Sequence, residues 1–324
     1  MTPTLWSTLI PREGATVTKT TIAAVQMRSR PKDVDHNIAT AERFVGEAAA
    51  AGAKLVLLPE VFNVGYYIGP SLFDLWETED GRTVTWMREQ ASLHGMMVGG
   101  TIAERRGDRL LNTFFMVEPD GRMYRYSKRQ PTKTELAAYD PGADESIVET
   151  SLGRIGRAVC ADIVWGRSLL RSLAGSVDLV LLPQANPEPK LLAPLIRRSE
   201  RRRRTPHERL IRAIGAPMAR AGLVGPVQRL SRVPLVDVYM YGGAFVADAD
   251  GRLLAGVPAG AEGVAVSEAA LGSTGGDPNA TVFKDPGLLV DLLQALAVSF
   301  PNLRPEQPSG RTCMRQNGAQ RERA

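Results

Sequence analysis

Residues 153–185, GRIGRAVCADIVWGRSLLRSLAGSVDLVLLPQA, contain a strand, a helix and a second strand in direct succession. The segments Arg154–Cys160 and Val177–Leu182 are too short for helices and are typical of buried strands. In the intervening segment, Trp165–Ala174, apolar residues recur at helical spacing. Because a strand–helix–strand connection usually joins parallel neighbours, this stretch predicts an α/β fold.

The same alternation continues toward the N-terminus. Thr21–Met27 and Lys54–Leu58 are predicted strands, and the helix between them is expected to be capped by Asp35 and to stop at Gly52. Further along, two strand-like runs flank residues 119–121 (Pro-Asp-Gly), which favours a hairpin turn. The pattern therefore indicates a layered sheet with helices packed on it.

Toward the C-terminus, Thr205, Pro206 and Glu208 predict a capped helix start. Gly243–Ala247 and Gly263–Ser267 are predicted to pair as a closing hairpin. The sequence predicts a flexible leader (1–19), a main domain (20–270) and a C-terminal extension (271–324) with a short helix and a disordered tail. Within the main domain, residues 190–204 are expected to form an arginine-rich, mobile surface insertion.

Cysteine usage and hydropathy indicate the compartment. The sequence holds two cysteines, Cys160 and Cys313, which suggest neither a disulfide framework nor a zinc site. The sequence shows no apolar run of membrane-spanning length, and residues 1–20 do not resemble a secretory signal. These features favour a cytoplasmic protein without a membrane partner.

The positive charge is concentrated in one segment. Residues 190–232 contain twelve basic and two acidic residues, a net +10, which leaves the rest of the chain at −5. The segment has no Phe, Trp or Tyr between its arginines, whereas single-stranded nucleic acids are usually bound by stacking on such rings. The sequence therefore disfavours a nucleic-acid partner, and the alternative is a nucleic-acid-associated protein that binds through the arginine segment.

Three reactive side chains come at strand ends, where α/β folds usually place their sites. Glu60 follows one buried strand, Lys128 ends a hairpin strand, and Cys160 closes the strand quoted above. Each alone is more often a surface acid, a solvated lysine or a buried small residue. Together they supply a base, a cation and a thiol, which covalent amide hydrolysis requires. The three histidines lie in or at the ends of predicted helices, so a Cys–His pair is poorly supported.

Four segments resemble the nitrilase superfamily of carbon–nitrogen hydrolases over about residues 20–270. They are LPEVFNVGYY (58–67), GRMYRYSKRQPTKTELAAYDPG (121–142), the stretch 153–185 and YGGAFVADADGRLLAG (241–256). The resemblance implies an α-β-β-α sandwich that pairs into an αββα–αββα dimer or a higher oligomer. It also implies no metal and no organic cofactor, and it places a second catalytic glutamate at Glu135.

The chemistry follows from these residues. Cys160 is the expected nucleophile that forms a thioester, and Glu60 is the expected base. Lys128 and the backbone N–H of Ala161 are expected to stabilise the oxyanion. The substrate is expected to be a small molecule: an aliphatic or aromatic amide, or an N-carbamoyl compound.

Residues that flank the three strand ends are candidates for the substrate pocket: Tyr66, Tyr67, Trp165 and Gln184. Each of them is also explained by ordinary packing. Asp162 is expected to anchor the turn after Cys160, whereas Asp140 and Arg167 receive no assigned role.

Some segments depart from the family pattern. Arg-Gln-Pro-Thr follows Lys128, Trp165-Gly166 follows the cysteine strand, and residues 219–225 lack the usual asparagine. These departures leave the substrate open. The alternatives are a nitrilase that converts a nitrile to an acid and ammonia, and a catalytically degenerate member that binds a partner.

Overall fold

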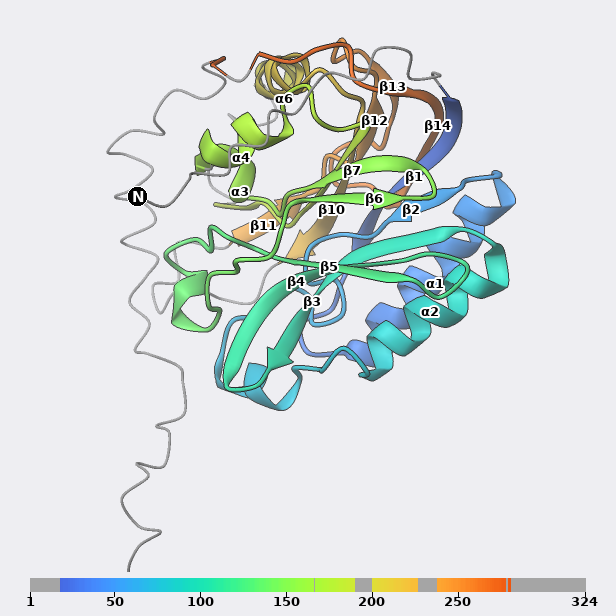
Figure 1. Ribbon diagram of the computed structural model, residues 1–324. Coiled ribbons are helices and arrows are strands. Elements are labelled where there is room, and N and C mark those ends of the chain that lie inside the picture. The colour runs from blue at the N-terminus through green and yellow to red at the C-terminus, as the bar shows by residue number, and fades with distance from the viewer. Residues whose placement is uncertain (1–17, 166, 190–199, 227–237, 278, 281–324) are drawn as a thin grey trace, which may run out of the picture.

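Fourteen strands in the described part of the chain form one hydrogen-bonded sheet, whose main path is β5-β4-β3-β2-β1-β10-β8-β7-β6 (Figure 1). The computed structural model describes residues 18–165, 167–189, 200–226, 238–277 and 279–280. The strands are β1 (Thr18–Arg28), β2 (Leu55–Leu57), β3 (Met97–Arg106), β4 (Arg109–Val117), β5 (Met123–Ser127), β6 (Ile147–Thr150), β7 (Gly153–Arg157), β8 (Leu179–Gln184), β9 (Pro187–Pro189), β10 (Met218–Pro226), β11 (Val238–Tyr241), β12 (Phe245–Ala247), β13 (Leu253–Gly256) and β14 (Gly263–Leu271). The helices are α1 (Val34–Ala50), α2 (Arg82–His94), α3 (Asp162–Trp165), α4 (Arg167–Leu173) and α6 (Glu200–Ile214), with 3-10 turns η1 (Pro70–Asp74) and η2 (Glu135–Ala137).

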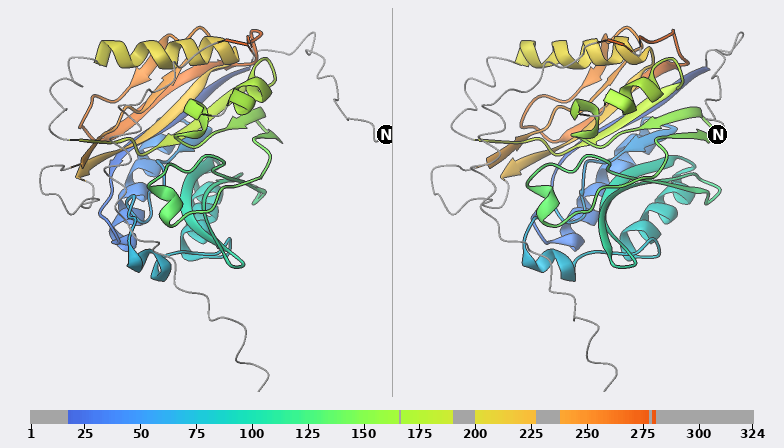
Figure 2. Two further views of the ribbon diagram at one scale, coloured as in Figure 1. Left: turned by 90° about the vertical axis from the view of Figure 1, so that its left-hand side faces the viewer. Right: turned by 60° about the vertical axis from the view of Figure 1, so that its left-hand side comes forward.

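The sheet folds on itself, so that its two halves face each other. In the inner core, Leu55 and Phe114 from one half pack in the same cluster as Ile155 and Leu179 from the other half. Helices α1 and α2 cover the outer face of the first half, and α4 and α6 cover the outer face of the second (Figures 1 and 2). The order helix, sheet, sheet, helix confirms the predicted α-β-β-α arrangement.

The N-terminal half agrees with the predicted elements except at one cap. Asp33, not Asp35, is the N-cap of α1, and its carboxylate accepts a hydrogen bond from the backbone N–H of His36. Asp35 already lies in the first turn, where a carboxylate faces the positive end of the helix dipole. The predicted stop at Gly52 and the hairpin turn at Gly121 are confirmed, because both glycines adopt left-handed backbone conformations.

Two predictions for the C-terminal half were wrong. Helix α6 begins at Glu200, so it runs through the predicted start at Thr205 and includes Arg201–Arg204 of the predicted surface insertion. Strand β12 pairs with β13 across a short turn, whereas Gly263–Leu271 forms β14 and pairs antiparallel to β1.

The predicted leader overlaps the sheet, because β1 already begins at Thr18. The rest of that leader, most of the arginine-rich insertion, and the predicted C-terminal helix and tail lie outside the described residues. Within the described chain no helix is long and apolar enough to cross a membrane.

The sheet brings the predicted reactive residues to one edge. Strands β3, β2, β1, β10, β8 and β7 are mutually parallel, and β5 has the same direction because two antiparallel pairings separate it from β3. The carboxyl ends of these strands therefore lie at a common edge. Glu60 follows β2, Lys128 follows β5 and Cys160 follows β7.

Candidate active site

Glu60 is fully buried, and both oxygens of its carboxylate accept hydrogen bonds. Its Oε1 accepts hydrogen bonds from Lys128 Nζ at 2.7 Å and from Asn112 Nδ2 at 2.9 Å. Its Oε2 accepts one from the backbone N–H of Ala185 at 2.9 Å. Strands β2, β4, β5 and β8 thus fix both oxygens of this carboxylate.

Lys128 carries a buried ammonium between two carboxylates. Besides Glu60, its Nζ contacts both oxygens of Glu135, at 2.8 and 2.7 Å. Although burial lowers the pKa of Lys128, the charges of Glu135 and Glu60 raise it well above its ordinary value. The side chain is therefore a fixed cation, because losing its proton would leave two carboxylates facing each other.

Glu135 is held by its own turn. Its Oε2 accepts a hydrogen bond from the backbone N–H of Thr132 at 2.7 Å, and its backbone N–H donates to Thr132 Oγ1 at 3.2 Å. This reciprocal pair has the form of a capping box, here at a single 3-10 turn. The carboxylate can therefore bind Lys128 without rearrangement.

Cys160 stands three residues beyond the end of β7 on a strained turn. Its backbone has a φ of 46°, which side chains other than glycine rarely adopt, and its N–H donates to Pro183 O at 3.1 Å. Burial and the charge of Glu60 raise the pKa of the Cys160 thiol to about 12, against the opposite effect of Lys128. The resting group is therefore a thiol, which donates to Asn186 Oδ1 at 3.7 Å.

The pKa of Glu60 is raised to about 7. Burial has the largest effect and raises it, the charge of Lys128 lowers it, the charge of Glu135 raises it, and hydrogen bonds to Lys128 and Cys160 lower it. A carboxylate that titrates near neutrality beside a protonated thiol can take the thiol proton when the sulfur attacks. The four side chains together can support nucleophilic catalysis with a general base and a fixed cation.

Asp162 anchors the turn that follows Cys160, as the sequence suggested. Its Oδ2 accepts hydrogen bonds from the N–H of Val159 at 3.0 Å and from the hydroxyl of Tyr126 at 2.9 Å. Its Oδ1 accepts one from the N–H of Gln130 at 2.7 Å. The carboxylate therefore joins the cysteine turn to the segment around Lys128.

Comparison with known proteins places this fold and site in a family. Residues 21–278 match the family model named carbon-nitrogen hydrolase. The chain belongs to the carbon–nitrogen hydrolase family. The match covers most of the chain, including the strand ends that carry the glutamate, the lysine and the cysteine.

Several curated relatives are about one-third identical to this carbon–nitrogen hydrolase. A chloroplastic omega-amidase of Arabidopsis thaliana is 32% identical over 193 residues, which is 54% of this chain and 52% of the relative. A nitrilase of Pyrococcus abyssi is 28% identical over 166 residues, 50% of this chain and 63% of the relative. The chain thus spans between about half and two-thirds of the length of these relatives.

Solved structures show the same fold. A CN-hydrolase superfamily protein from Xanthomonas campestris, described with an arsenic adduct in its active site, has a TM-score of 0.66 at 23% identity, covering 78% of this chain and 90% of that one. An amidase from Nesterenkonia sp. AN1, in which acrylamide has added to the active-site cysteine, has a TM-score of 0.61 at 23% identity, covering 76% and 92%. At these identities the likeness concerns the fold.

The predicted pocket residues of this family member lie in different surroundings. Tyr66 is buried close to the charged cluster. Burial, and then the charge of Glu135, raise the pKa of Tyr66 well above its ordinary value. Tyr67 packs instead beneath Lys32, whose Nζ is 5.5 Å from the ring centre. Gln184 ends β8 and accepts a hydrogen bond from Asn186 Nδ2 at 3.2 Å.

The other residues named from the sequence are placed as follows. Ala161 is buried directly after the cysteine. Trp165 is the last residue of α3 and Arg167 the first of α4, and the described part of the structure excludes both side chains. Asp140 accepts a hydrogen bond from the N–H of Leu110 at 3.3 Å, at the start of β4.

Three partners of the cluster were not predicted from the sequence: Asn112, Asn186 and the N–H of Ala185. Asn112 carried a signal, because it is an amide among apolar residues in the strand RLLNTFFMV. A buried amide needs hydrogen-bond partners, which a polar site supplies. Asn186 and Ala185 follow Leu-Pro-Gln in a loop, where periodicity gives no information.

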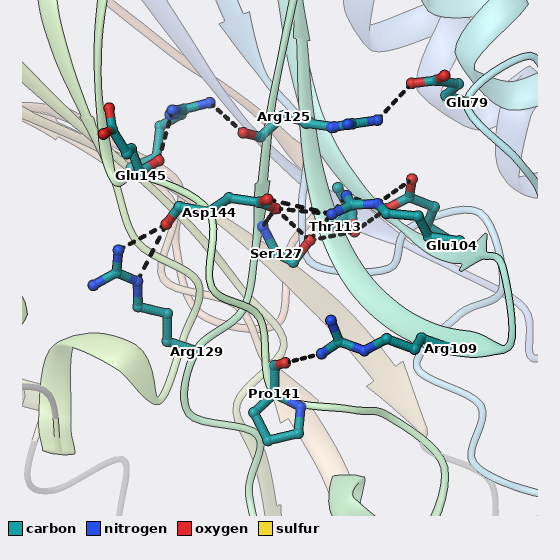
Figure 3. A network of polar contacts seen from close by, with 12 residues as sticks. Glu79, Glu104, Arg109, Thr113, Arg125, Ser127, Arg129, Pro141, Asp144 and Glu145 are labelled. Atoms are coloured by element: carbon teal, nitrogen blue, oxygen red, sulfur yellow. Dashed lines mark hydrogen bonds and ion pairs between the residues drawn. The ribbon is translucent and has the colours of Figure 1, made fainter.

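A network of arginines holds the segment Pro141–Glu145 against β5 (Figure 3). Asp144 accepts hydrogen bonds from Ser127 N at 2.9 Å and Ser127 Oγ at 2.7 Å, and it pairs with Arg106 at 3.2 Å. Arg129 donates to the carbonyl of Asp144 at 2.7 Å, and Arg109 to that of Pro141. Since Ser127 precedes Lys128, this network fixes the strand end that carries the ammonium.

Proposed function

We propose that the chain hydrolyses a small non-peptide amide through a covalent thioester on Cys160. The observation that carries the proposal is the buried cluster of Glu60, Lys128 and Glu135 beside the cysteine. Its charges match what the reaction needs: a base near neutrality, a permanent cation and a protonated nucleophile.

In the first half-reaction, Cys160 Sγ attacks the amide carbon while Glu60 takes the thiol proton. The ammonium of Lys128 and the N–H of Ala161 stabilise the oxyanion, a contribution of about 3 kcal/mol per donor. An ammonium has three protons, so one of them can turn toward the substrate while the two carboxylates hold the others. The C–N bond then breaks, and Glu60 returns the proton to the leaving nitrogen.

In the second half-reaction, water attacks the thioester. Glu60 takes a proton from the water, the carbonyl carbon again passes through an oxyanion held by Lys128, and the thiol leaves with a proton from Glu60. The products are a carboxylic acid and ammonia or an amine. Glu135 keeps the ammonium in place throughout, and Tyr66 is the best supported pocket residue because its phenol ring borders the charged groups.

Amide substrates are favoured because relatives in plants and fish are named omega-amidases. A nitrile is the second candidate, since the Pyrococcus abyssi relative is named a nitrilase. A nitrile would consume one more water per turnover, because addition of the thiol gives a thioimidate. One water converts the thioimidate to the thioester and ammonia, and a second water hydrolyses the thioester. A degenerate, non-catalytic member is disfavoured by the complete set of Glu60, Lys128 and Cys160.

The test is ammonia release from a panel of aliphatic and aromatic amides, N-carbamoyl compounds and nitriles. We expect turnover by the wild-type chain and none by Cys160→Ala. Cys313→Ser is the control, because that residue belongs to the polar C-terminal part of the sequence and has no role in the proposed chemistry. Equal activity of Cys160→Ala and wild type, or no turnover of any compound, would contradict the proposal.

The family resemblance further supports a dimer. The apolar face of α4 does not carry this proposal, because Leu169, Leu170 and Leu173 are buried within the chain beside α6. We therefore expect the dimer to use another surface, and light scattering at micromolar concentration should give twice the chain mass. A monomer would contradict this proposal and would leave the proposed chemistry intact.

A further inference from the structure

Arg157 is a buried arginine that the proposed chemistry does not use. It lies at the end of β7, three residues before Cys160, and only 3% of its surface is exposed. Its guanidinium donates to two backbone carbonyls, that of Arg125 at 2.9 Å and that of Glu145 at 2.8 Å. Burial of this charge is unfavourable, and it lowers the pKa of Arg157 to about 10.

The bond to Arg125 crosses between the halves of the folded sheet, whereas Glu145 lies just before β6, the neighbour of β7 in the same half. Strands β5 and β7 lie near opposite ends of the strand order, and yet Tyr126 of β5 and Val159 beyond β7 belong to the same inner core. Arg125 belongs to β5, three residues before Lys128. Figure 3 shows the carbonyls of Arg125 and Glu145 turned toward the same guanidinium group.

A second contact across the halves lies on the other side of the cysteine. Asp162, two residues after Cys160, accepts the hydroxyl of Tyr126 at 2.9 Å and the N–H of Gln130 at 2.7 Å. Tyr126 and Gln130 are two residues before and two residues after Lys128. The chain segments of the thiol and of the ammonium are therefore joined both before and after their reactive residues.

The position of the base relative to the thiol depends on other contacts. Glu60 is bound by the N–H of Ala185, and the N–H of Cys160 binds the carbonyl of Pro183, so β8 and the residues after it hold both groups. Arg157 contributes to neither of these two bonds. Glu60 and Lys128 share one direct contact. Apart from it, β8 and the residues after it hold the Glu60–Cys160 geometry, whereas Arg157 and Asp162 hold the Lys128–Cys160 geometry.

We infer that Arg157 is a positioning residue that sets the placement of the Lys128 ammonium relative to the Cys160 sulfur. The inference rests on the proposed function, in which that placement forms the oxyanion site. The guanidinium suits this task because its planar fork binds two carbonyls in fixed directions, which a lysine cannot do. Neither carbonyl is part of a reacting group, so the arginine acts only through the strand that it holds.

The experiment compares Arg157→Met and Arg157→Lys with Arg154→Met. Arg154 is the matched control, because it lies on the same strand and pairs with Glu149 at 3.3 Å, away from β5. For an amide that the wild type hydrolyses, we expect Arg157→Met to lower kcat by about 10- to 100-fold with little change in KM, since small displacements of reacting groups have effects of that size. The kcat of Arg157→Lys should lie between those of Arg157→Met and the wild type, and the kcat of Arg154→Met should equal that of the wild type.

A second measurement distinguishes positioning from loss of the folded site. Alkylation of Cys160 by iodoacetamide needs the thiol and its base but forms no oxyanion, so its rate in Arg157→Met should stay within about threefold of the wild type. A kcat equal to wild type would overturn the inference. An alkylation rate that falls in parallel with kcat would also overturn it, because the whole site would then have been disturbed.

A third measurement is independent of turnover. Amide hydrogen exchange should become faster in Arg157→Met both at residues 125–130 and at residues 157–162, and in neither segment of Arg154→Met. If the wild type hydrolysed no amide or nitrile, the proposed function would fail, and hydrogen exchange would still test the connection. Unchanged exchange in both segments would show that Arg157 does not join them.

Discussion

In the proposed reaction Glu60 acts in both of its protonation states during one cycle. It would accept a proton from the thiol and later donate one to the leaving nitrogen, so a pKa far from neutrality would impair one of the two steps. Burial raises its pKa to about 7, and Lys128 opposes this shift. Burial thus supplies the base, and the lysine prevents the carboxyl group from staying protonated.

The first prediction concerns the pH dependence of this group. Below its pKa Glu60 is protonated and cannot accept the thiol proton, so kcat/KM for a neutral amide should rise with pH and level off above a midpoint of about 7. Lys128 and Cys160 keep their protons through this range because the pKa of each is raised. Initial rates from about pH 5 to about pH 9 measure the midpoint. A profile that is flat across this range would contradict the role of Glu60.

The second prediction concerns Asn112. Its Nδ2 donates to Glu60 Oε1 and so favours the charged carboxylate. Replacement by leucine should move the midpoint of the same pH profile upward by about one unit, the size expected for one hydrogen bond to a charged group. Asn63→Leu is the control, because Asn63 is also buried but its Nδ2 donates to Glu77 and Thr83, not to Glu60. An equal shift in both variants would indicate a general effect of losing a buried amide.

The principal residues could be predicted because each follows a strand at the same edge of the sheet. Glu60, Lys128 and Cys160 needed only the positions of strand ends and the chemistry of the side chains. Asn186 could not be predicted, since its contact with the cysteine depends on a loop that brings residues 26 positions apart together. Tyr66 and Tyr67 are neighbours in sequence, and only the three-dimensional packing places the first near the cluster and the second beneath Lys32.

The segment that follows η2 is packed tightly against the end of β5. The N–H of Gly142 donates to Lys128 O at 2.7 Å. A Cβ atom on Gly142 would lie 2.2 Å from the carbonyl oxygen of Ser127, which is backbone and cannot rotate away. The absence of a side chain at this position therefore lets the segment approach the strand that carries the ammonium.

The third prediction follows from this approach. Gly142→Ala should lower the free energy of unfolding by about 1–3 kcal/mol, because the added methyl group forces the backbone apart. It should also lower kcat, since Lys128 would move with the strand end. Gly46→Ala is the control: Gly46 lies inside α1 with no atom within 4 Å of a new Cβ, so it should raise stability by about 0.5–1 kcal/mol. Chemical denaturation of both variants measures the two changes in stability. A Gly142→Ala variant as stable and as active as the wild type would contradict the prediction.

Elements with strong local signals were predicted well, and those decided by distant partners were not. Helix α1 and the β4–β5 hairpin are specified by periodicity and by glycines at their ends. The predicted pairing of β12 with residues 263–267 does not form, because β14 pairs with β1 over nine positions, more than a short hairpin with β12 could provide. Likewise, the signal for a helix start at Thr205 is overridden in α6, whose apolar residues Leu210, Ile211 and Ile214 pack in the outer core.

Positive and negative charges are separated along the chain. Residues 190–232 carry a net +10 and the rest of the chain −5. Four of the arginines, Arg201–Arg204, occupy the first turns of α6, in the outer helix layer of the second sheet half (Figure 2). Such a separation creates a field that acts on charged molecules before they reach a site.

The last prediction is that these arginines affect how fast an anionic substrate arrives and leave the chemical step unchanged. Because Arg201–Arg204 are helical, glutamine is the suitable replacement, since it keeps helix propensity while removing four charges. Turnover of a neutral amide should stay within about twofold of the wild type. For an amide that carries a carboxylate, kcat/KM should fall by about three- to tenfold at low salt, and the difference should shrink near physiological ionic strength, where the Debye length is about 8 Å.

The control for this prediction replaces the same four arginines with lysine. Lysine keeps the charge and most of the helix propensity, so this variant should show the wild-type dependence on salt. If the lysine variant behaved like the glutamine variant, a specific contact of the guanidinium groups and not the field would be responsible. If the glutamine variant lost turnover of the neutral amide while its circular dichroism spectrum stayed unchanged, the arginines would belong to the site itself, because a field that steers anions has no effect on the arrival of an uncharged molecule.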